Sequence, residues 1–412
     1  MPSTFSWIDH SEIHRRKMLD AIDLFREKGT RDELGLSVVR DGLADLLFPG
    51  TGALQTRARY FFFVPWMYQH LERDRVRSSS IVREARAFEV RLIKSVLQSD
   101  DHAGTIGARA RDELQRLPSS IYWSGLYRLQ IRLFEGSQDD YHRSLDAYYR
   151  GTSRLQKTDD GDPVEPVPLN WHPKVPSAPA AFAAIRGSRG EPSPIALSLE
   201  PGESDYLADR IHGTAGSSLF AWFLDQLTET SEVPFVWAHE LASRLPDRLR
   251  RHVTHAQAFS DVMVGAAILY NGMVCEGPPL RQDKRDEMES AFATWFKEVE
   301  VRSDALNRWD HRDFWSLVAD SGARPSSGAR SFVDGWVDCT FRAGNSSSFW
   351  NSQEARTLIR NREWSLKRSL ARLYSQHARE IWNGYTGLSR MDFRWGNAQV
   401  VLNDILVGQE RA

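Results

Sequence analysis

Apolar residues recur every three or four positions along most of the chain, which is the spacing of one face of an α-helix. Strand-like alternation is scarce and extends at most over residues 235–237 and 333–340. The pattern therefore predicts a mainly α protein. Helices are expected at residues 9–29, 37–47, 55–72, 80–97, 117–129, 137–150, 203–211, 218–227, 247–276, 283–299, 353–382 and 398–407.

The proline distribution suggests where the helical pattern is interrupted. Nine of the 18 prolines fall between Pro163 and Pro201, and the 412-residue length favours two domains. We therefore expect two helical domains, residues 1–155 and 203–412, joined by a proline-rich connector at 156–202. Within the second, the helix at 247–276 should be central, because Gly265 and the two alanines after it would let another helix approach closely.

Charge and cysteine content narrow the function classes. The net charge is −2, but 45 of the 53 basic residues are arginine, the side chain best suited to bidentate phosphate contacts; a GC-rich genome is the alternative explanation. Cys275 and Cys339 form no disulfide framework and fit a reducing compartment. The first residues lack the apolar core of a signal peptide, and the longest apolar runs are too short to span a bilayer. A cytoplasmic protein without a membrane partner is expected.

The richest segment is a turn between two predicted helices, Pro49-Gly50-Thr51-Gly52, followed by Thr56-Arg57-Ala58. It resembles the helix-hairpin-helix of DNA-repair glycosylases and polymerases, whose glycines let backbone N–H groups approach a DNA phosphate. An extra residue before Thr56 and the missing Gly-x-Asp segment depart from that motif. A plain interhelical turn is the alternative. The DNA-binding candidates here are Gly50, Thr51, Gly52, Thr56, Arg57, Arg59 and Tyr60.

Carboxylates precede this turn. Asp41 and Asp45 share a helix face opposite the apolar stripe, where they would either orient water or simply face solvent. Asp32 and Glu33 would either take part in catalysis or serve as an N-cap and a first-turn acid. As catalytic candidates we rank Asp41 first, then Asp32 and Glu33.

A second basic region lies near the C-terminus. Residues Glu354–Arg372 carry a net charge of +4 with Trp364 among them, a composition that suits a phosphate track as well as a solvated helix face. Its DNA-binding candidates are Arg360, Arg362, Lys367 and Arg372.

Cofactor motifs are not evident. His252 and His255 are three residues apart, but no third ligand follows by spacing, so no metal is expected. The sequence contains no Walker A loop, H-E-x-x-H or G-x-S-x-G motif. We therefore expect no cofactor and no nucleotide-driven motor.

Several longer segments carry a family resemblance. They are FSWIDHSE at Phe5–Glu12, TRDELG at Thr30–Gly35, RDGLADLLFPGTGALQTRARYFFFVPW at Arg40–Trp66, RLPSSIYWSGL at Arg116–Leu126, HAQAFSDVMVGAAILYN at His255–Asn271 and RNREWSLKRSLARL at Arg360–Leu373. With them, nearly the whole chain resembles a bacterial domain-of-unknown-function family associated with phage-defence islands.

The resemblance implies a DNA glycosylase that acts on double-stranded phage DNA. Such an enzyme excises a hydroxymethylated or glucosylated cytosine and leaves an abasic site. The alternative is a non-catalytic DNA-binding or scaffold subunit of a multi-gene defence system, working with a helicase, a nuclease and other proteins of the locus.

Overall fold

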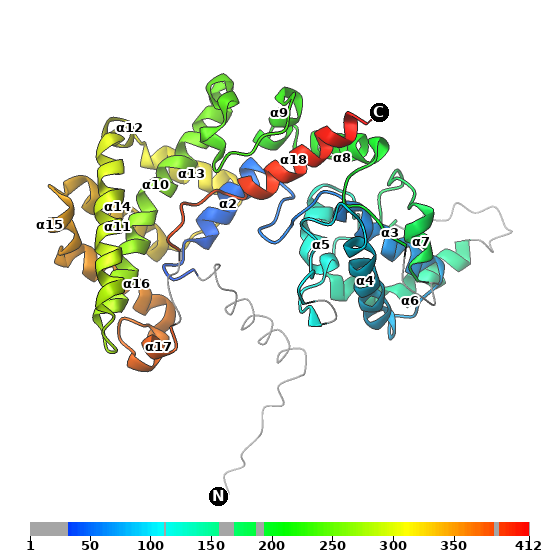
Figure 1. Ribbon diagram of the computed structural model, residues 1–412, viewed down its shortest axis with the longest axis horizontal. Coiled ribbons are helices and arrows are strands. Elements are labelled where there is room, and N and C mark those ends of the chain that lie inside the picture. Colours follow the sequence, from blue (N-terminus) through cyan, green and yellow to red (C-terminus); the bar gives the residue numbers. More distant parts are fainter. Residues whose placement is uncertain (1–31, 111–112, 156–168, 187–192, 383–386, 412) are drawn as a thin grey trace, which may run out of the picture. The chain divides into compact units, whose positions relative to one another are not determined.

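The computed structural model describes residues 32–110, 113–155, 169–186, 193–382 and 387–411; the helix expected at 9–29 lies outside these ranges. The described chain is mainly helical, as predicted (Figure 1). Its β-type pairing consists of one isolated bridge between Arg132 and Trp171. The α-helices are α2 (Ser37–Leu47), α3 (Tyr60–Arg73), α4 (Ile81–Leu97), α5 (Pro118–Arg128), α6 (Gln138–Leu155), α7 (Ala180–Ala184), α8 (Pro201–Ala215), α9 (Leu219–Gln226), α10 (Asp247–Glu276), α11 (Gln282–Val301), α12 (Ser303–Asn307), α13 (His311–Asp320), α14 (Ser327–Arg342), α15 (Ser346–Trp350), α16 (Gln353–Lys367), α17 (Gln376–Glu380) and α18 (Trp395–Gln409). Short 3₁₀ helices are η2 (Val236–Ala238), η3 (Glu240–Arg244) and η4 (Arg368–Leu370).

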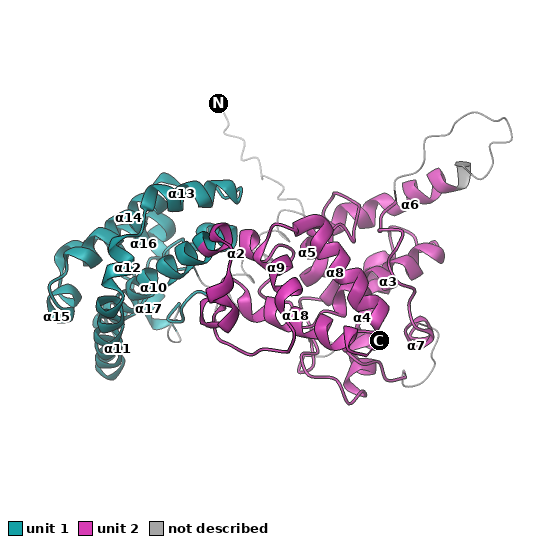
Figure 2. Ribbon diagram, turned by 90° about the horizontal axis from the view of Figure 1, so that it is seen from above, with its two compact units in different colours: residues 1–43, 251–391 teal, residues 44–250, 392–412 magenta. Residues whose placement is uncertain are grey.

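The chain forms two compact units, and each is built from separate stretches of sequence (Figure 2). Unit 1 comprises residues 1–43 and 251–391, and unit 2 comprises residues 44–250 and 392–412. This division differs from the predicted 1–155 and 203–412. The described part of the proline-rich stretch belongs to unit 2 because its backbone bonds to the rest of that unit. The amide of Leu133 donates to the carbonyl of Asn170 at 2.8 Å, and the amide of Ile195 donates to the carbonyl of Ser95 at 3.3 Å.

Most predicted helices are present, with two instructive errors. The strand considered at 333–340 lies within α14, where Phe332, Val333, Trp336 and Val337 are buried at helical spacing. The single helix predicted at 353–382 ends at Lys367, because Arg368 takes a left-handed backbone conformation with φ of 50°. A positive φ at a residue with a side chain cannot continue a right-handed helix.

In unit 1, tryptophan rings pack directly against the backbone of α10. The Trp295 and Trp336 indoles donate to the carbonyls of Asp261 and Val262 at 2.7 and 2.9 Å. A Cβ added to Gly265 would meet the Trp295 ring at 2.2 Å, and one added to Gly272 would meet Trp350 at 2.2 Å. The space at Gly265 is therefore filled by a tryptophan side chain of α11, whereas the sequence predicted the close approach of another helix.

In unit 2, the core is aromatic and centres on α3. Every residue from Tyr60 to Tyr68 is buried. Helices α4 and α5 pack on α3, while α18 packs on α8 and α9. This arrangement holds the C-terminal end of α3 beside α6, the region developed below.

Helix α10 is the one helix in the described ranges that is long and apolar enough to cross a membrane. In its most apolar window, 94% is buried within the protein. Such burial is typical of the core helix of a folded unit.

Replacing Gly265 with alanine should overpack unit 1. We expect a loss of about 1–3 kcal/mol in unfolding free energy, because the Trp295 ring is held by its own hydrogen bond and cannot move freely. Gly213→Ala on α8 is the control, since a Cβ there meets nothing within 4 Å; it should be neutral or slightly stabilising. Thermal unfolding of both variants checks this, and equal melting temperatures would contradict it.

Candidate functional site

A carboxylate turned toward the interior marks the end of helix α3. Glu72 follows Tyr68 by one turn on the same helix face and is partly buried with it. Its Oε1 accepts three hydrogen bonds: from the hydroxyl of Tyr141, from Nδ2 of Asn170 at 3.0 Å and from the indole of Trp171 at 3.0 Å. One oxygen of this carboxylate is therefore fixed by three neutral donors.

The three donors are themselves held in place. Tyr141 lies on α6, whereas Asn170 and Trp171 belong to the extended segment that bridges to Arg132. The amide of His172 donates to the carbonyl of Ile131 at 2.8 Å, and the Trp171 ring stacks on Tyr68 with centroids 5.7 Å apart. Glu72 thus has little freedom to rotate.

Burial changes the acidity of the groups around Glu72. It raises the pKa of the Glu72 carboxyl, while the three hydrogen bonds act in the opposite direction. Burial also raises the pKa of the Tyr148 hydroxyl, and the nearby charge of Glu72 adds to the rise. A carboxylate with a raised pKa accepts a proton more readily than an exposed one.

Glu72 also lines a cavity of about 640 Å³. Within the ranges that the structure describes, the hydrogen bonds to Glu72 engage Oε1 and not Oε2. Aromatic side chains form part of the wall and two exposed arginines lie beside it. The lining residues relevant here are Trp66, Arg73, Arg75, Tyr148 and Tyr149. The arrangement suits a flat ring held beside a proton-accepting carboxylate.

The predicted catalytic carboxylates lie elsewhere, and each has a partner. In unit 1, Asp32 caps α2 by accepting from the amides of Leu36 and Ser37, both at 2.6 Å. Asp41 is half-buried and bonds to its neighbour Arg40 at 3.0 Å. In unit 2, Asp45 pairs with Arg394 at 2.5 Å. Asp32 therefore has the capping role that was the alternative to catalysis. Asp41 and Asp45 each pair with an arginine.

Glu33 is the buried member of the predicted carboxylates. It pairs with Lys367, and its Oε1 lies 2.6 Å from Nη1 of Arg372. The Tyr270 hydroxyl donates to Glu363 at 2.7 Å and lies 3.5 Å from Glu33. The structure thus brings one predicted catalytic residue together with two predicted DNA-binding residues, and both cations neutralise it.

The remaining basic candidates near the C-terminus divide between buried and accessible positions. Arg362 is buried and donates to the carbonyls of Leu34 and Gly35 at 2.7 and 3.0 Å. Arg360 is half-buried on α16. Arg372 lies beyond the end of that helix, so the expected continuous basic helix face does not extend to it.

The predicted hairpin uses its donors internally. The Gly52 amide donates to Oε1 of Gln55 at 3.0 Å, and the Thr56 amide donates to the Tyr122 hydroxyl at 2.9 Å. Gly50 has φ of 87°, as a tight turn requires, and Thr51 bonds back to the Phe48 carbonyl at 2.6 Å. Two amides that would face a phosphate in a helix-hairpin-helix therefore already have partners.

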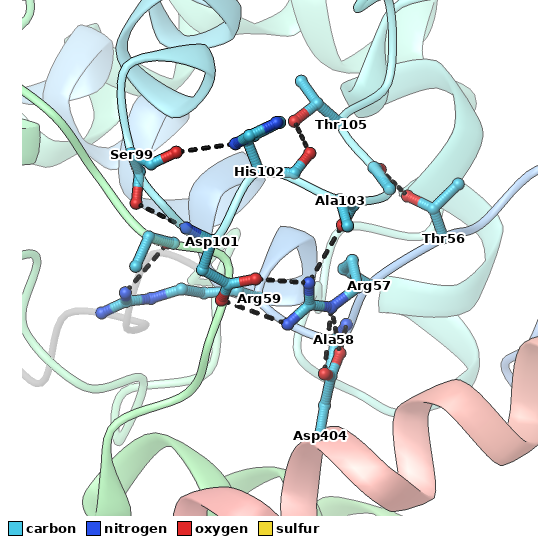
Figure 3. Close-up of polar contacts among 12 residues, drawn as sticks. Thr56, Arg57, Ala58, Arg59, Ser99, Asp101, His102, Ala103, Thr105 and Asp404 are labelled. Carbon is cyan, nitrogen blue, oxygen red and sulfur yellow. Dashed lines mark hydrogen bonds and ion pairs between the residues drawn. The ribbon is translucent and has the colours of Figure 1, made fainter.

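Arg57 is held between two carboxylates of unit 2 (Figure 3). Its Nε donates to Asp404 at 3.0 Å, and Nη1 donates to Asp101 at 2.9 Å and to the Ala103 carbonyl at 3.0 Å. Burial lowers the pKa of Arg57, but the two carboxylates raise it further than burial lowers it. Arg57 therefore joins three segments of unit 2.

Arg59 and Tyr60 are also interior residues. Arg59 is 4% exposed and donates to Glu203 of α8 at 2.8 Å. Tyr60 is 1% exposed, and its hydroxyl accepts from the Ile106 amide at 3.0 Å. Tyr60, a DNA-binding candidate from the sequence, is therefore not placed to stack on a base, because its ring packs against Phe63 and Tyr122.

The histidine pair has structural partners as well. Nε2 of His255 bonds to Asp313 at 2.8 Å, and its Nδ1 accepts from the Trp309 indole at 2.9 Å. Across the described ranges, no group of three or more His, Cys, Asp or Glu side chains is arranged to hold a metal ion.

Sequence reasoning missed Glu72, although a signal was present. Residues 60–68 form an unbroken apolar run. Glu72 lies four residues after Tyr68 and therefore on the same face of the helix. A carboxylate on a core-facing position of an aromatic helix needs donors from elsewhere in the chain. Its partners are more than 65 residues away, so the sequence offered no pattern that linked them.

Comparison with known proteins identifies the family. A family model described as a family of unknown function, DUF6361, matches residues 2–407. The chain belongs to DUF6361. No curated protein and no solved structure matches the chain significantly. Membership in DUF6361 confirms the resemblance to a domain-of-unknown-function family at that level, so the chemistry of this member has to be argued from its own residues.

Replacing Glu72 with glutamine should change stability in a pH-dependent manner. Because burial raises the pKa of Glu72 above its unfolded value, the carboxyl favours folding when protonated, and this contribution is lost as pH rises through the folded pKa. Glu72→Gln should therefore become more stable relative to wild type as pH rises above about 4, the unfolded pKa of a glutamate. Chemical denaturation across this range checks the trend. A stability difference that falls with increasing pH would contradict it.

Proposed function

We propose that this member of DUF6361 is a monofunctional DNA glycosylase with Glu72 as its catalytic carboxylate. The observation that supports this most directly is that a cavity-lining carboxylate has one oxygen, Oε1, fixed by Tyr141, Asn170 and Trp171. A glycosylase needs a rigid carboxylate beside a pocket for the extruded base, and no redox step is involved.

The reaction follows from this arrangement. The bond between the sugar C1′ and the base nitrogen breaks, and its electron pair leaves with the base. Water attacks C1′, Oε2 of Glu72 orients this water and accepts its proton, and the proton then passes to the departing base. The negative charge of Glu72 also stabilises the oxocarbenium-like sugar in the transition state. The products are a free base and an abasic site.

The size and lining of the cavity suit a bulky base. Ligand pockets are typically about 300–1,000 Å³, and the cavity at Glu72 measures about 640 Å³. In this proposal, half-buried Tyr148 stacks on the extruded base, and the exposed Arg73 and Arg75 contact the flanking phosphates. These features support a hydroxymethylated or glucosylated cytosine in phage DNA as the substrate; the antiphage setting itself rests on the sequence resemblance.

A second candidate is a non-catalytic scaffold subunit of a phage-defence system, working with a helicase and a nuclease. It is favoured by four exposed aliphatic side chains around a groove in unit 1: Val38, Leu366, Leu370 and Ile381. An enzyme acting alone has no need for such a surface.

An abasic-site assay separates the two functions. Purified protein should generate alkali-labile sites in phage DNA that contains modified cytosine, with EDTA present and without ATP. Glu72→Gln should reduce the rate at least about 100-fold, because it removes the proton acceptor and the charge. The matched control is Glu240→Gln, an exposed carboxylate of unit 2.

Each other outcome has a distinct meaning. Intact DNA under all conditions favours the scaffold function, and loss of activity in EDTA indicates a metal enzyme. Full activity of Glu72→Gln removes Glu72 from the mechanism. In that case Asp41→Asn, Asp32→Asn and Glu33→Gln, measured in parallel, test the carboxylates ranked from the sequence.

The phosphate contacts can be tested by salt dependence. If Arg73 and Arg75 each neutralise one phosphate, changing both to glutamine should reduce the salt slope of DNA binding by about 2, for modified and unmodified DNA alike. Fluorescence anisotropy at several salt concentrations measures this slope. Arg360→Ala provides the comparison: a reduction in that variant, with none in the double variant, would place the phosphate track on α16.

A further inference from the structure

A groove of about 810 Å³ in unit 1 has a wall that is largely apolar and unusually exposed. Four aliphatic side chains line it: Val38 on α2, Leu366 on α16, Leu370 in η4 and Ile381 after α17. They are 45%, 43%, 73% and 68% exposed, respectively. Such a cluster of exposed aliphatic groups is costly in water and marks an interaction surface.

The groove is built on a rigid base. Glu33 pairs with Lys367 and Arg372, so two segments distant in sequence, one around Glu33 and one around Lys367–Arg372, are joined there by charge. Arg362 adds bonds to the backbone of Leu34 and Gly35. The aliphatic side chains are therefore presented by a preformed surface.

The charges around the groove select the kind of partner. Four cationic side chains line it, Arg324, Arg362, Lys367 and Arg372, against two carboxylates, Asp32 and Glu33. Both carboxylates already have internal partners, because Asp32 caps α2 and Glu33 bridges two of the cations. The lining cations outnumber the carboxylates by two. Lys367 and Arg372 pair with Glu33, and Arg362 is buried against backbone carbonyls, so the exposed Arg324 is the lining cation most accessible to a partner.

We infer that this groove docks an amphipathic, acidic helix of a partner protein. The spacing of aliphatic residues along such a helix, at i, i+3 or i+4 and i+7, fills an apolar groove, and its flanking carboxylates face the cationic edge. The partner's helix removes the exposed aliphatic surface from water, and this burial supplies the binding free energy. The interaction is independent of the proposed glycosylase chemistry, which lies in unit 2.

The test uses the full chain and a defined probe. A fluorescein-labelled peptide of about 15 residues carries leucine at those helical spacings and glutamate on the flanks. A matched peptide carries lysine in place of glutamate. Fluorescence anisotropy should show saturable binding of the acidic peptide, at least about tenfold weaker binding of the basic peptide, and weakening of the acidic complex as salt rises.

The variants are made at exposed positions, where a substitution does not disturb the packed core. Leu370→Glu and Ile381→Glu should each weaken binding of the acidic peptide at least about tenfold, since each places a charge in the apolar contact. Leu280→Glu is the control, because Leu280 is 64% exposed in unit 1 and does not line the groove. Circular dichroism should show unchanged helicity in all three.

Three results would overturn the proposal. They are no binding of the acidic peptide by wild type, equal binding of the acidic and basic peptides, and equal losses in Leu370→Glu and Leu280→Glu. The remaining possibility is that a segment of this chain occupies the groove. The double variant Ile22→Ser and Phe25→Ser, made in the full chain, tests this. If peptide binding appears only in that variant, residues 1–31 of the chain itself occupy the groove, and the partner assignment fails.

Discussion

The structure depends above all on one constraint: a charge removed from water must find a partner. Burying a charge without one costs several kcal/mol, more than most single contacts contribute. Each unit meets this requirement with residues far apart in sequence. Arg57 binds Asp101 and Asp404 in unit 2, and Glu33 binds Lys367 and Arg372 in unit 1. These ion pairs join segments that are distant in sequence within each unit.

Glu72 meets the same constraint in a different way, and this difference suggests its function. Its donors are neutral and all engage one oxygen, so its charge is held in position without being cancelled. Glu89 is a useful comparison. Burial raises its pKa to about 7, but both of its oxygens are bonded, one to the amide and one to the hydroxyl of Ser119. Of these two carboxylates, Glu72 lines a cavity, and its hydrogen bonds within the described part of the chain all engage one oxygen.

The two units use their surfaces differently. In unit 2 the aromatic side chains are buried around α3, and the accessible chemistry is concentrated at the end of that helix. In unit 1, Trp295, Trp336 and Trp350 pack against α10 in the core, whereas aliphatic side chains remain exposed around the groove. A chemical site in one unit and a docking surface in the other would let catalysis and assembly vary independently.

The sequence by itself determined the helical class and most helix positions, because helical periodicity is a local property. It placed α2 and α10 to the residue and indicated close packing at Gly265. It also suggested a capping role for Asp32. It did not find Glu72, the interior positions of Arg59 and Tyr60, or the division into two interleaved units. Those features depend on which distant segments meet, such as Glu72 with Asn170 or Arg57 with Asp404. Only the tertiary structure decided these features, because a local sequence pattern does not indicate which distant residue will pair with a buried charge.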